Sequence, residues 1–413
     1  MNPELILYLT SVLFLILFLF LLFIFVIIIM SLFKKRNKLE KYVPKITVLV
    51  PAFNEEKNID ACITSIENSG YPKNKMQIIL IDDGSTDNTI KIAKQHKGII
   101  ILNQNHQGKT EALNSGVKKS KTEIIVSLDA DTIIEQKCIQ KLVAPLKNKK
   151  IGATTGTSKV NTQKTFLQVF QGIEYNFNNL IRKAFTDIFK SGIWFFGVVA
   201  AYQKNALEDV GYFKKDTFTE DMDIALELHS KGYTTLHVYD AIVYTEVPKN
   251  IKELNKQRKR WWVGVLQSLR KNKLLKLREN MSIQFLYLNQ YWWSLYALIS
   301  IPVIVYQYMY WVPFNISTMV QFLQYTFNWF SVAGSVYVIY KIPEWGINFY
   351  SIFGVLSGII TTTLIVISQI TFRDKFTIKR IIAIFFYFPY TIVLNIMIFL
   401  SIIGYKKKGY FRK

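Results

Sequence analysis

The stretch "MQIILIDDGSTDNT", residues 76–89, decides the fold, because its aliphatic run stops abruptly at carboxylates and a glycine. Two other stretches share this design: "KITVLVPAFNEE" at residues 45–56 and "TEIIVSLDADT" at residues 122–132. Polar stretches with helical character separate the three. Strands that alternate with helices predict a mostly parallel sheet with helices on its faces.

Polar side chains gather where these strands end. Such sheets bind their ligands at the carboxyl ends of the strands, where Asn54, Asp83, Asp129 and Asp131 fall. Two carboxylates as close as Asp129 and Asp131 repel each other unless a cation lies between them. Oxygen ligands favour Mg²⁺ or Mn²⁺. The alternative is an exposed turn in which Asp serves only as a turn-forming residue.

The composition indicates a membrane protein. The 413 residues are 50% hydrophobic and 15% aromatic. Leu5–Phe33 carries no charge and exceeds the roughly 20 residues that cross a bilayer. It lacks the short apolar core, basic start and cleavage site of a secretory signal, so we expect it to stay attached. The basic cluster at residues 34–45 predicts that this side faces the cytoplasm.

Further apolar segments follow a soluble block. Uncharged runs near 285–311, 318–340, 345–372 and 381–405 predict about four more spans. Four spans return the chain end to the cytoplasm but leave the basic loop "RDKFTIKR", residues 373–380, outside, against the positive-inside rule. One of the four is therefore a candidate for an interfacial or re-entrant helix.

These patterns divide the chain into four regions. Residues 1–33 form an N-terminal transmembrane helix, and residues 43–279 form a cytoplasmic domain. The basic run "RKNKLLKLREN" at the end of this domain predicts an interfacial helix on the membrane surface. Residues 280–405 form a C-terminal transmembrane region, and residues 406–413 form a basic tail.

The ordered motifs "PAFNEE", "IDDGSTDNT", "GKTEALNSG", "LDADT", "TED" and "QRKRW" resemble the processive family 2 glycosyltransferases, the membrane synthases of cellulose, chitin, hyaluronan and poly-N-acetylglucosamine. The resemblance covers essentially the whole soluble block. "TEDMDIALELHSKGY" and "VPKNIKELNKQRKRWW" look most similar to the bacterial poly-β-1,6-N-acetylglucosamine synthases. The resemblance implies a GT-A type nucleotide-sugar-binding fold and an inverting transfer from a UDP-sugar.

The resemblance also implies the donor site. The substrate-binding residues that it indicates are Pro51, Ala52, Phe53, Asn54, Glu55, Asp83, Lys109, Asp129 and Trp261. Asp83 accepts a hydrogen bond from the nucleobase, Glu55 lies near the nucleoside, and Lys109 lies near the diphosphate. Asp129 and Asp131 match the metal motif, with Asp131 as the direct ligand of Mg²⁺ or Mn²⁺. Many family members have Tyr where Phe53 stands.

The catalytic residues that the resemblance implies are Asp221, Glu220, Gln257, Arg260 and Trp261. Asp221 is the general base that takes a proton from the acceptor hydroxyl, and Glu220 supports its loop. Arg260 approaches the diphosphate, and Trp261 stacks under the acceptor sugar. The structural alternative for the TED motif is a helix with Thr219 as its N-cap, because acidic residues are favoured in a first helical turn. The alternative for the QRKRW motif is a belt of Lys, Arg and Trp at the membrane interface. Asp223 is expected to cap or pair on the helix.

The preferred function is a processive synthase that extends a β-linked polysaccharide and couples synthesis to export. Its partners are a UDP-sugar, with UDP-N-acetylglucosamine ahead of UDP-glucose, the growing polysaccharide and the lipid bilayer, with room for a small membrane accessory subunit. Alternatives are a non-processive enzyme that glycosylates a lipid carrier, a cellulose, chitin or hyaluronan type synthase, and a transporter or receptor that only binds nucleotide-sugars. "WFFGVVAAYQK", residues 194–204, departs from the small polar residues of the nearest relatives, and Gly197 keeps room there.

The net charge of +22 does not indicate a nucleic-acid partner, because the basic residues flank membrane segments rather than forming a recognised binding motif. Anionic lipid is the simpler partner. The two cysteines, Cys62 and Cys138, match no zinc or redox spacing. The histidines lack metal-ligand spacing, so we expect surface or core roles for them: His96, His106, His229 and His237.

Overall fold

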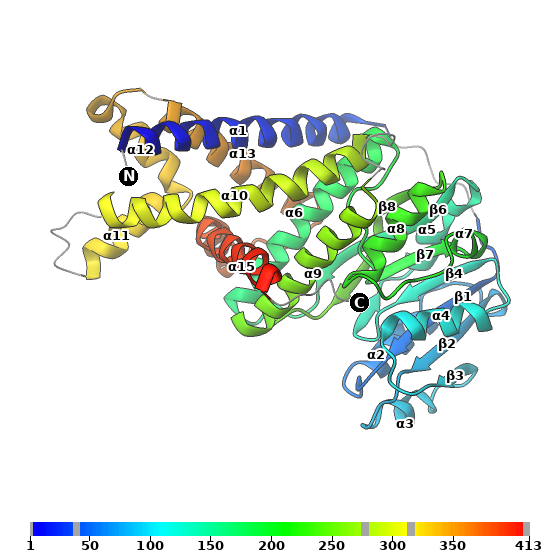
Figure 1. The fold of residues 1–413 in the computed structure, drawn as a ribbon. Helices are drawn as coiled ribbons and strands as arrows, with labels where there is room; N and C mark the ends of the chain where they lie inside the picture. Colours follow the sequence, from blue (N-terminus) through cyan, green and yellow to red (C-terminus); the bar gives the residue numbers. More distant parts are fainter. Residues whose placement is uncertain (1–2, 36–41, 274–280, 312–318, 348, 408–413) are drawn as a thin grey trace.

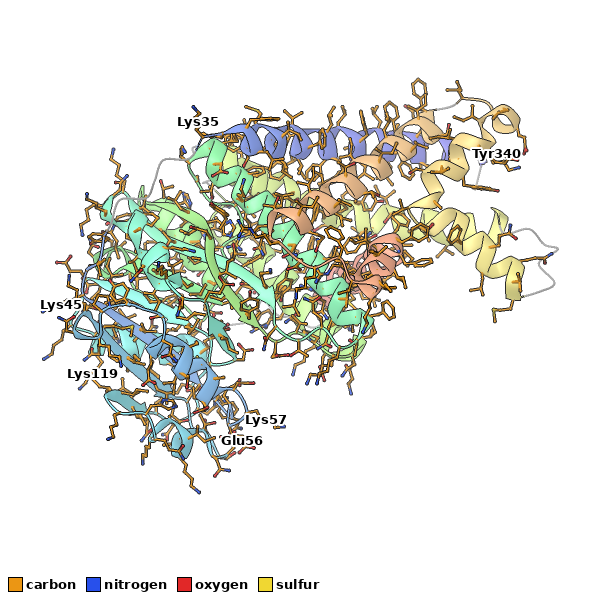
Figure 2. The ribbon with its side chains drawn as sticks, turned by 180° about the vertical axis from the view of Figure 1, so that it is seen from behind. Lys35, Lys45, Glu56, Lys57, Lys119 and Tyr340 are labelled. Carbon is orange, nitrogen blue, oxygen red and sulfur yellow. The ribbon has the colours of Figure 1, made fainter. Side chains whose placement is uncertain are left out.

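The computed structural model describes residues 3–35, 42–273, 281–311, 319–347 and 349–407. Figure 1 shows two parts, a sheet with surrounding helices at one end and long helices packed side by side at the other. In Figure 2 the side-chain nitrogen and oxygen atoms gather mainly on the sheet part, whereas the long helices carry mostly carbon. The predicted boundaries between cytoplasmic and transmembrane regions stay predictions.

Eight strands form one mixed sheet in the order β3-β2-β1-β4-β7-β6-β8-β5. In chain order they are β1 (Ile46–Ala52), β2 (Met76–Asp82), β3 (Ile99–Asn103), β4 (Ile124–Leu128), β5 (Thr132–Ile134), β6 (Ile151–Val160), β7 (Val199–Gln203) and β8 (Thr234–Thr245). Strands β1 to β4 are mutually parallel, as the three leading motifs predict. Strand β7 runs antiparallel to β4 and β6, and β5 runs antiparallel to β8.

Helices cover both faces of the sheet, which explains the continuous aliphatic runs of its strands. They are α2 (Ile59–Glu67), α3 (Thr89–Ala93), α4 (Lys109–Lys119), α5 (Cys138–Val143), α6 (Phe166–Phe189), α7 (Lys204–Asp209), α8 (Glu220–Ser230) and α9 (Ile251–Lys271). Val48 of β1 packs in a core with α2 and α5, and its neighbour Leu49 packs in a second core with α4 and α8. The cysteines Cys62 and Cys138 are free and buried in the first core.

The second core continues from the sheet into the long helices. These are α1 (Pro3–Phe33), α10 (Met281–Trp311), α11 (Met319–Phe330), α12 (Ala333–Trp345), α13 (Phe349–Thr371), α14 (Ile378–Phe385) and α15 (Tyr387–Lys407). Phe185 of α6 contacts Phe285 of α10 with a centroid distance of 4.7 Å, and Phe23 of α1 lies against the same pair. The sheet domain and the helices therefore share one apolar interior.

Three helical segments within the described residues are long and apolar enough to cross a membrane: Tyr8–Phe33, Ser351–Thr371 and Tyr387–Gly404. The run expected near 318–340 is divided between α11 and α12, because the helix breaks around Ser331, whose hydroxyl bonds to Phe327 O. Each half is about 18–20 Å long and cannot span a hydrocarbon core of about 30 Å alone. Most of the expected interfacial run at 270–280 lies outside the described residues.

The basic loop at 373–380 docks on the sheet domain. Asp374 Oδ1 lies 2.6 Å from Lys159 Nζ of β6, and Asp374 Oδ2 accepts from Asn176 Nδ2 of α6 at 2.8 Å. Arg380 also pairs with Asp374 and donates to Gln163 Oε1 at 2.6 Å. The loop is therefore packed against β6 and α6 of the sheet domain. The expected four-span arrangement, which puts this loop on the side of the membrane opposite the sheet domain, stays a prediction.

Candidate active site

The ends of β1 and β2 are joined by hydrogen bonds between their loops. Pro51 and Ala52 are the last residues of β1, and Ala52 O accepts from Asp83 N at 2.9 Å. Asn54 adopts a left-handed conformation with φ of 56°, which Asn tolerates better than most residues. Its Oδ1 accepts from Thr86 N at 2.8 Å, and Glu55 N donates to Thr89 Oγ1 at 2.8 Å. These hydrogen bonds hold the loops after β1 and β2 side by side.

The buried Asp83 carboxylate holds the loop that leads into α4. Its Oδ1 accepts from Gln104 Nε2 at 2.6 Å and from Gln107 N at 2.9 Å, and its Oδ2 accepts from Gly108 N at 2.9 Å. Burial raises the pKa of Asp83, but these hydrogen bonds outweigh burial and lower it overall. Contact between this carboxylate and a nucleobase, as predicted, requires one of these bonds to be exchanged.

His106 is a site residue that the sequence did not reveal. Its ring lies 4.1 Å, centroid to centroid, from the exposed ring of Phe53, and its Nδ1 lies 2.9 Å from Asp83 Oδ2. Its imidazole is 59% exposed, so it is a surface residue as expected. The stack places two flat rings beside the strand ends, where a nucleobase could pack.

Lys109 forms the centre of a charged cluster. Its Nζ lies 2.7 Å from Asp129 Oδ1 and 3.0 Å from Glu220 Oε1. Burial raises the pKa of Asp129, against the lowering effect of Lys109 and Arg260. For Glu220 the same cations outweigh burial and lower the pKa. Lys109, predicted beside a diphosphate, thus joins the end of β4 to the start of α8.

Asp131 lies beside this cluster, and its Oδ1 accepts from Thr132 Oγ1 at 3.1 Å. Burial and the nearby charges of Asp129 and Glu55 raise its pKa to about 6. A bound cation would stabilise the ionised form of this carboxylate. Mg²⁺ usually binds only one or two protein carboxylates. No group of three or more His, Cys, Asp and Glu side chains among the described residues could hold a metal ion alone. Asp129 and Asp131 therefore fit a metal whose remaining ligands come from a substrate.

Asp221 is fixed in the first turn of α8 by two backbone donors. Its Oδ2 accepts from Gly197 N at 2.7 Å, and its Oδ1 accepts from Met222 N at 2.8 Å. Burial and the adjacent Glu220 raise its pKa to about 6, although Lys109 and the two N–H groups oppose the shift. A Cβ at Gly197 would lie 2.7 Å from Asp221 Cβ, so this close approach requires glycine. The space beside Gly197 is thus taken by the Asp221 side chain, and the expectation that Gly197 keeps room for an acceptor stays a prediction.

The first turn of α8 also corrects the capping alternative. The hydroxyl of Thr219 is buried without a hydrogen-bond partner among the described residues, so its side chain does not cap the helix. Asp223 instead pairs with Lys271 of α9 at 2.7 Å, as the pairing expectation predicts. This ion pair holds α9 against α8.

Helix α9 brings the QRKRW segment to the same region. The charge of Arg260 acts on Asp129 and Glu220, so this residue lies near the cluster. Arg258 was not predicted: its guanidinium lies 4.5 Å from the ring centroid of Trp261 and 2.9 Å from Glu174 Oε2. The indole of Trp261 therefore rests on a fixed cation. Gln257 is partly buried, and its Oε1 has no partner within the described part of the chain.

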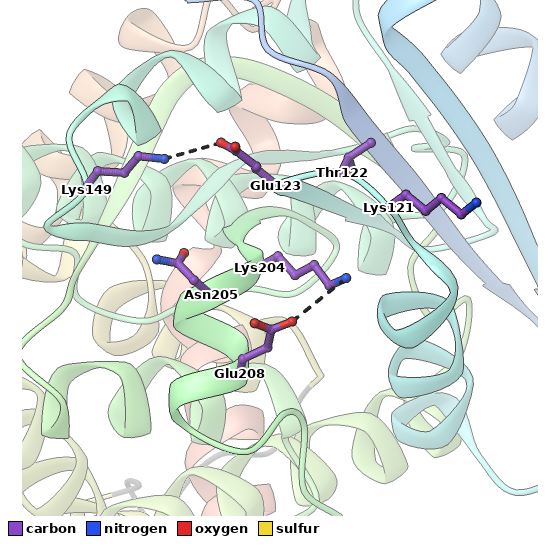
Figure 3. A pocket seen from close by; sticks show the side chains of 7 residues that line it. All are labelled: Lys121, Thr122, Glu123, Lys149, Lys204, Asn205 and Glu208. Atoms are coloured by element: carbon purple, nitrogen blue, oxygen red, sulfur yellow. Dashed lines mark ion pairs between the residues drawn. The ribbon is translucent and has the colours of Figure 1, made fainter.

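A separate pocket lies at the opposite end of β4 (Figure 3). Its volume is about 400 Å³, and its lining residues are Lys121, Thr122, Glu123, Lys149, Lys204, Asn205 and Glu208. Glu123 precedes the first residue of β4, whereas Asp129 follows the last. The pocket contains surface ion pairs between Lys149 and Glu123 at 3.7 Å and between Lys204 and Glu208 at 3.9 Å. It is not part of the carboxylate cluster.

The chain is similar to known proteins in both sequence and fold. The family described as "Glycosyltransferase like family 2" matches residues 44–264. The poly-beta-1,6-N-acetyl-D-glucosamine synthase of Staphylococcus aureus is 33% identical over 225 residues, which are 53% of this chain and 54% of the relative. The Staphylococcus epidermidis enzyme of the same name is 33% identical over 227 residues, 54% and 55% of the two chains. The chain thus spans about half the length of the curated relatives that it matches.

One solved structure shows the same fold across most of the chain. A mannosyltransferase from Pyrobaculum calidifontis, solved in complex with GDP-Man and Mn²⁺, aligns with a TM-score of 0.59 and 18% identity. The alignment covers 89% of this chain and 100% of that protein. At this identity the likeness concerns the fold alone, and it confirms the predicted GT-A type architecture.

Proposed function

The chain belongs to glycosyltransferase family 2, and from this premise we propose that it is a membrane-bound, processive, inverting synthase of a β-linked polysaccharide. Poly-N-acetylglucosamine made from UDP-N-acetylglucosamine is the favoured product, because two relatives at 33% identity are named for that polymer. The observation that carries the proposal is the placement of Asp221. It is a partly exposed carboxylate with a pKa of about 6, next to a cationic and acidic cluster at the strand ends.

In the proposed reaction Asp221 takes the proton of an acceptor hydroxyl while that oxygen bonds to the anomeric carbon of the donor. The bond from this carbon to the diphosphate oxygen breaks, and UDP leaves with the electron pair. One displacement converts an α-linked donor into a β-linkage. The N–H groups of Gly197 and Met222 orient the carboxylate, so that proton transfer needs no reorganisation of the base.

Asp129 and Asp131 are the proposed ligands of Mg²⁺ or Mn²⁺. The bound ion would offset negative charge on the departing UDP. Arg260 and Lys109 add positive charge at the same end of β4, and Glu220 holds the Lys109 ammonium in place. When a diphosphate enters, Lys109 can exchange a carboxylate for phosphate oxygens without losing its ion pairing.

Trp261 is the proposed platform for the acceptor sugar. The guanidinium of Arg258 packs on its ring, and Glu174 holds that guanidinium by an ion pair while also accepting from Tyr390 of α15. The remaining indole surface is then available to sugar C–H groups. Such a contact does not fix individual hydroxyls, which suits repeated addition to a growing chain.

We place the sheet domain and the loop at 373–380 in the cytoplasm and propose a multi-pass topology. The basic cluster after α1 supports this side. Helix α10 then leads outward, α11 and α12 lie at the outer surface, and α13 returns to the loop. Figure 2 agrees, since Tyr340 of α12 lies at the end of the helices that is remote from the sheet domain, whereas Lys35 lies at the junction. Helix α15 is a further apolar segment long enough to span.

Competition among UDP-sugars tests the proposed donor. The purified full chain in detergent is given UDP-N-acetylglucosamine labelled in its uridine with Mg²⁺ or Mn²⁺, and release of labelled UDP is followed in the presence of unlabelled UDP-N-acetylglucosamine, UDP-glucose or UDP-glucuronic acid. We expect release that only UDP-N-acetylglucosamine suppresses efficiently, and that a chelator abolishes. Release that continues at full rate with chelator present would exclude the proposed role of Asp129 and Asp131.

A further inference from the structure

Arg182 of α6 is a buried cation whose hydrogen-bond acceptors within the described part of the chain are all neutral. Its side chain is inaccessible to solvent, and its Nε donates to Trp194 O at 3.1 Å. The other donors reach Gly156 O at 3.3 Å, Asn179 Oδ1 at 3.0 Å and Thr155 Oγ1 at 3.2 Å. Burying a guanidinium without a bonded carboxylate costs folding free energy. If Arg182 served only to stabilise the fold, an apolar side chain of similar size would give a more stable protein.

The contacts of Arg182 converge on the segment that precedes Gly197. Besides holding Trp194 O, the guanidinium carbon lies 4.2 Å from the ring centroid of Phe196. Thr155, which accepts from Arg182, donates its hydroxyl proton to Phe196 O at 2.6 Å. Both the backbone and the ring of the 194–196 segment are thus held from one point.

The next residue in the chain contacts the proposed base. Gly197 N donates to Asp221 Oδ2 at 2.7 Å, and the backbone there approaches too closely for any side chain. The two charges also interact through space: burial lowers the pKa of Arg182, Asp221 opposes this, and the resulting value is about 9. A displacement of the 194–196 segment would therefore move the N–H that orients Asp221.

We propose that Arg182 is a positioning residue for glycosyl transfer, which holds the 194–196 segment so that Gly197 N–H keeps Asp221 aimed at the acceptor hydroxyl. The proposal rests on the proposed function of Asp221 as the base. In this proposal Arg182 lowers the stability of the fold but aligns the catalytic base.

Three variants of the full chain in detergent test this role. Arg182→Met removes the charge and all four hydrogen bonds, and Arg182→Lys keeps the charge without the planar fork. Lys183→Met is the matched control, because Lys183 is a buried cation on the same helix that bonds instead to Ser31 and Asp187. Each assay uses whichever UDP-sugar the wild-type protein turns over best, so that a wrong donor assignment leaves the comparison intact.

We expect Arg182→Met to lower kcat about 10²-fold, the loss typical of a misaligned catalytic group, with KM for the UDP-sugar and affinity for UDP almost unchanged. Arg182→Lys should recover part of this loss, and Lys183→Met should keep kcat near the wild-type value. A folded Arg182→Met protein with wild-type kcat would overturn the proposal. An equal loss of kcat in Lys183→Met would also overturn the proposal, because it would show that removing any buried cation from α6 lowers kcat.

If Arg182→Met does not fold, Thr155→Val decides the question. This variant keeps the buried charge but removes the hydroxyl that links Arg182 to Phe196 O. A fall in kcat without a change in KM supports the positioning role. Unchanged kcat in folded Thr155→Val overturns it.

Discussion

At the scale of single residues, the adjacent carboxylates of Glu220 and Asp221 have pKa values shifted in opposite directions because their partners differ. Glu220 pairs with the Lys109 ammonium, whereas Asp221 accepts from two backbone N–H groups and lies next to the negative Glu220. The pKa of Asp221 is raised to about 6 by burial and by Glu220. This value suits a base near neutral pH, since it combines ionisation with appreciable basicity.

Replacing Asp221 with Asn should abolish transfer while leaving donor binding intact. The amide keeps the size of the carboxylate but cannot accept a proton, and loss of a general base costs about 10² to 10⁴ in rate. The matched control is Asp223→Asn two residues along the same helix, which breaks the pair with Lys271 and should lower stability but keep kcat. UDP release and UDP binding are measured on both. Wild-type kcat in Asp221→Asn would return the acidic cluster to a structural role.

The rate of transfer should rise as the pH increases through about 6 and level off above it. The proposed base acts only when ionised, and Asp221 and Asp131 both have pKa values raised to about 6. Below that pH both are protonated, so kcat falls on the acid side. A pH–rate profile between pH 5 and 8 checks this expectation. A profile without change over that range would argue that neither carboxylate limits the rate.

The sequence predicts the position of a residue from its local pattern better than it predicts contacts between residues far apart in the chain. Asn54, Asp83 and Asp129 follow aliphatic runs, so their place at the strand ends could be predicted from the chain itself. His106 and Arg258 could not be predicted, because their roles depend on partners about 50 to 80 positions away, in Phe53 and Glu174. No local pattern encodes such a pair.

At the scale of elements, the parallel half of the sheet could be predicted and the antiparallel half could not. Strands β1, β2 and β4 have continuous aliphatic runs that end in turns. Strand β7, "VAAYQ", is short and rich in Ala, and only its pairing between β4 and β6 makes it a strand. The break between α11 and α12 carries no proline, but Val332 N at the break donates to Phe385 O of α14 at 3.1 Å, a tertiary contact that the local sequence does not indicate.

Asp374→Asn should loosen the docked loop and destabilise the whole protein. Asp374 is mostly buried between Lys159 and Arg380, and loss of one partner of a buried ion pair costs about 3–5 kcal/mol. The control is Glu123→Gln, which breaks an exposed pair with Lys149 and should cost less than about 1 kcal/mol. Thermal unfolding in detergent compares the two. Equal midpoints would show that the loop does not depend on Asp374.

At the scale of the whole molecule, the docked loop at 373–380 constrains the number of membrane crossings in the proposed topology. Because residues 373–380 bond to the sheet domain, the proposed topology requires an even number of membrane crossings between α9 and this loop. In the proposed topology α10 and α13 are these two crossings, and α11 and α12 lie at the end remote from the sheet domain (Figure 1). The positive-inside rule, which four spans violated, is then obeyed by this loop.

Cysteine labelling in intact cells checks this topology. Lys375 in the loop and Ile347 between α12 and α13 are both exposed, and the native Cys62 and Cys138 are buried, so background labelling should be low. We expect Ile347→Cys to react with an impermeant maleimide from outside, and Lys375→Cys to react only after the cells are permeabilised. Labelling of Lys375→Cys in intact cells would place the loop and the sheet domain on the outer side.

The size distribution of the product tests the central claim most directly. The purified full chain is reconstituted in lipid nanodiscs with UDP-N-acetylglucosamine and a divalent cation, started with a short labelled pulse and then diluted into excess unlabelled donor. We predict that labelled chains continue to lengthen after dilution and form long polymer, because a processive enzyme keeps its acceptor between additions. Label that stays in a product with a single added sugar, or that remains on a lipid carrier, would contradict a processive synthase.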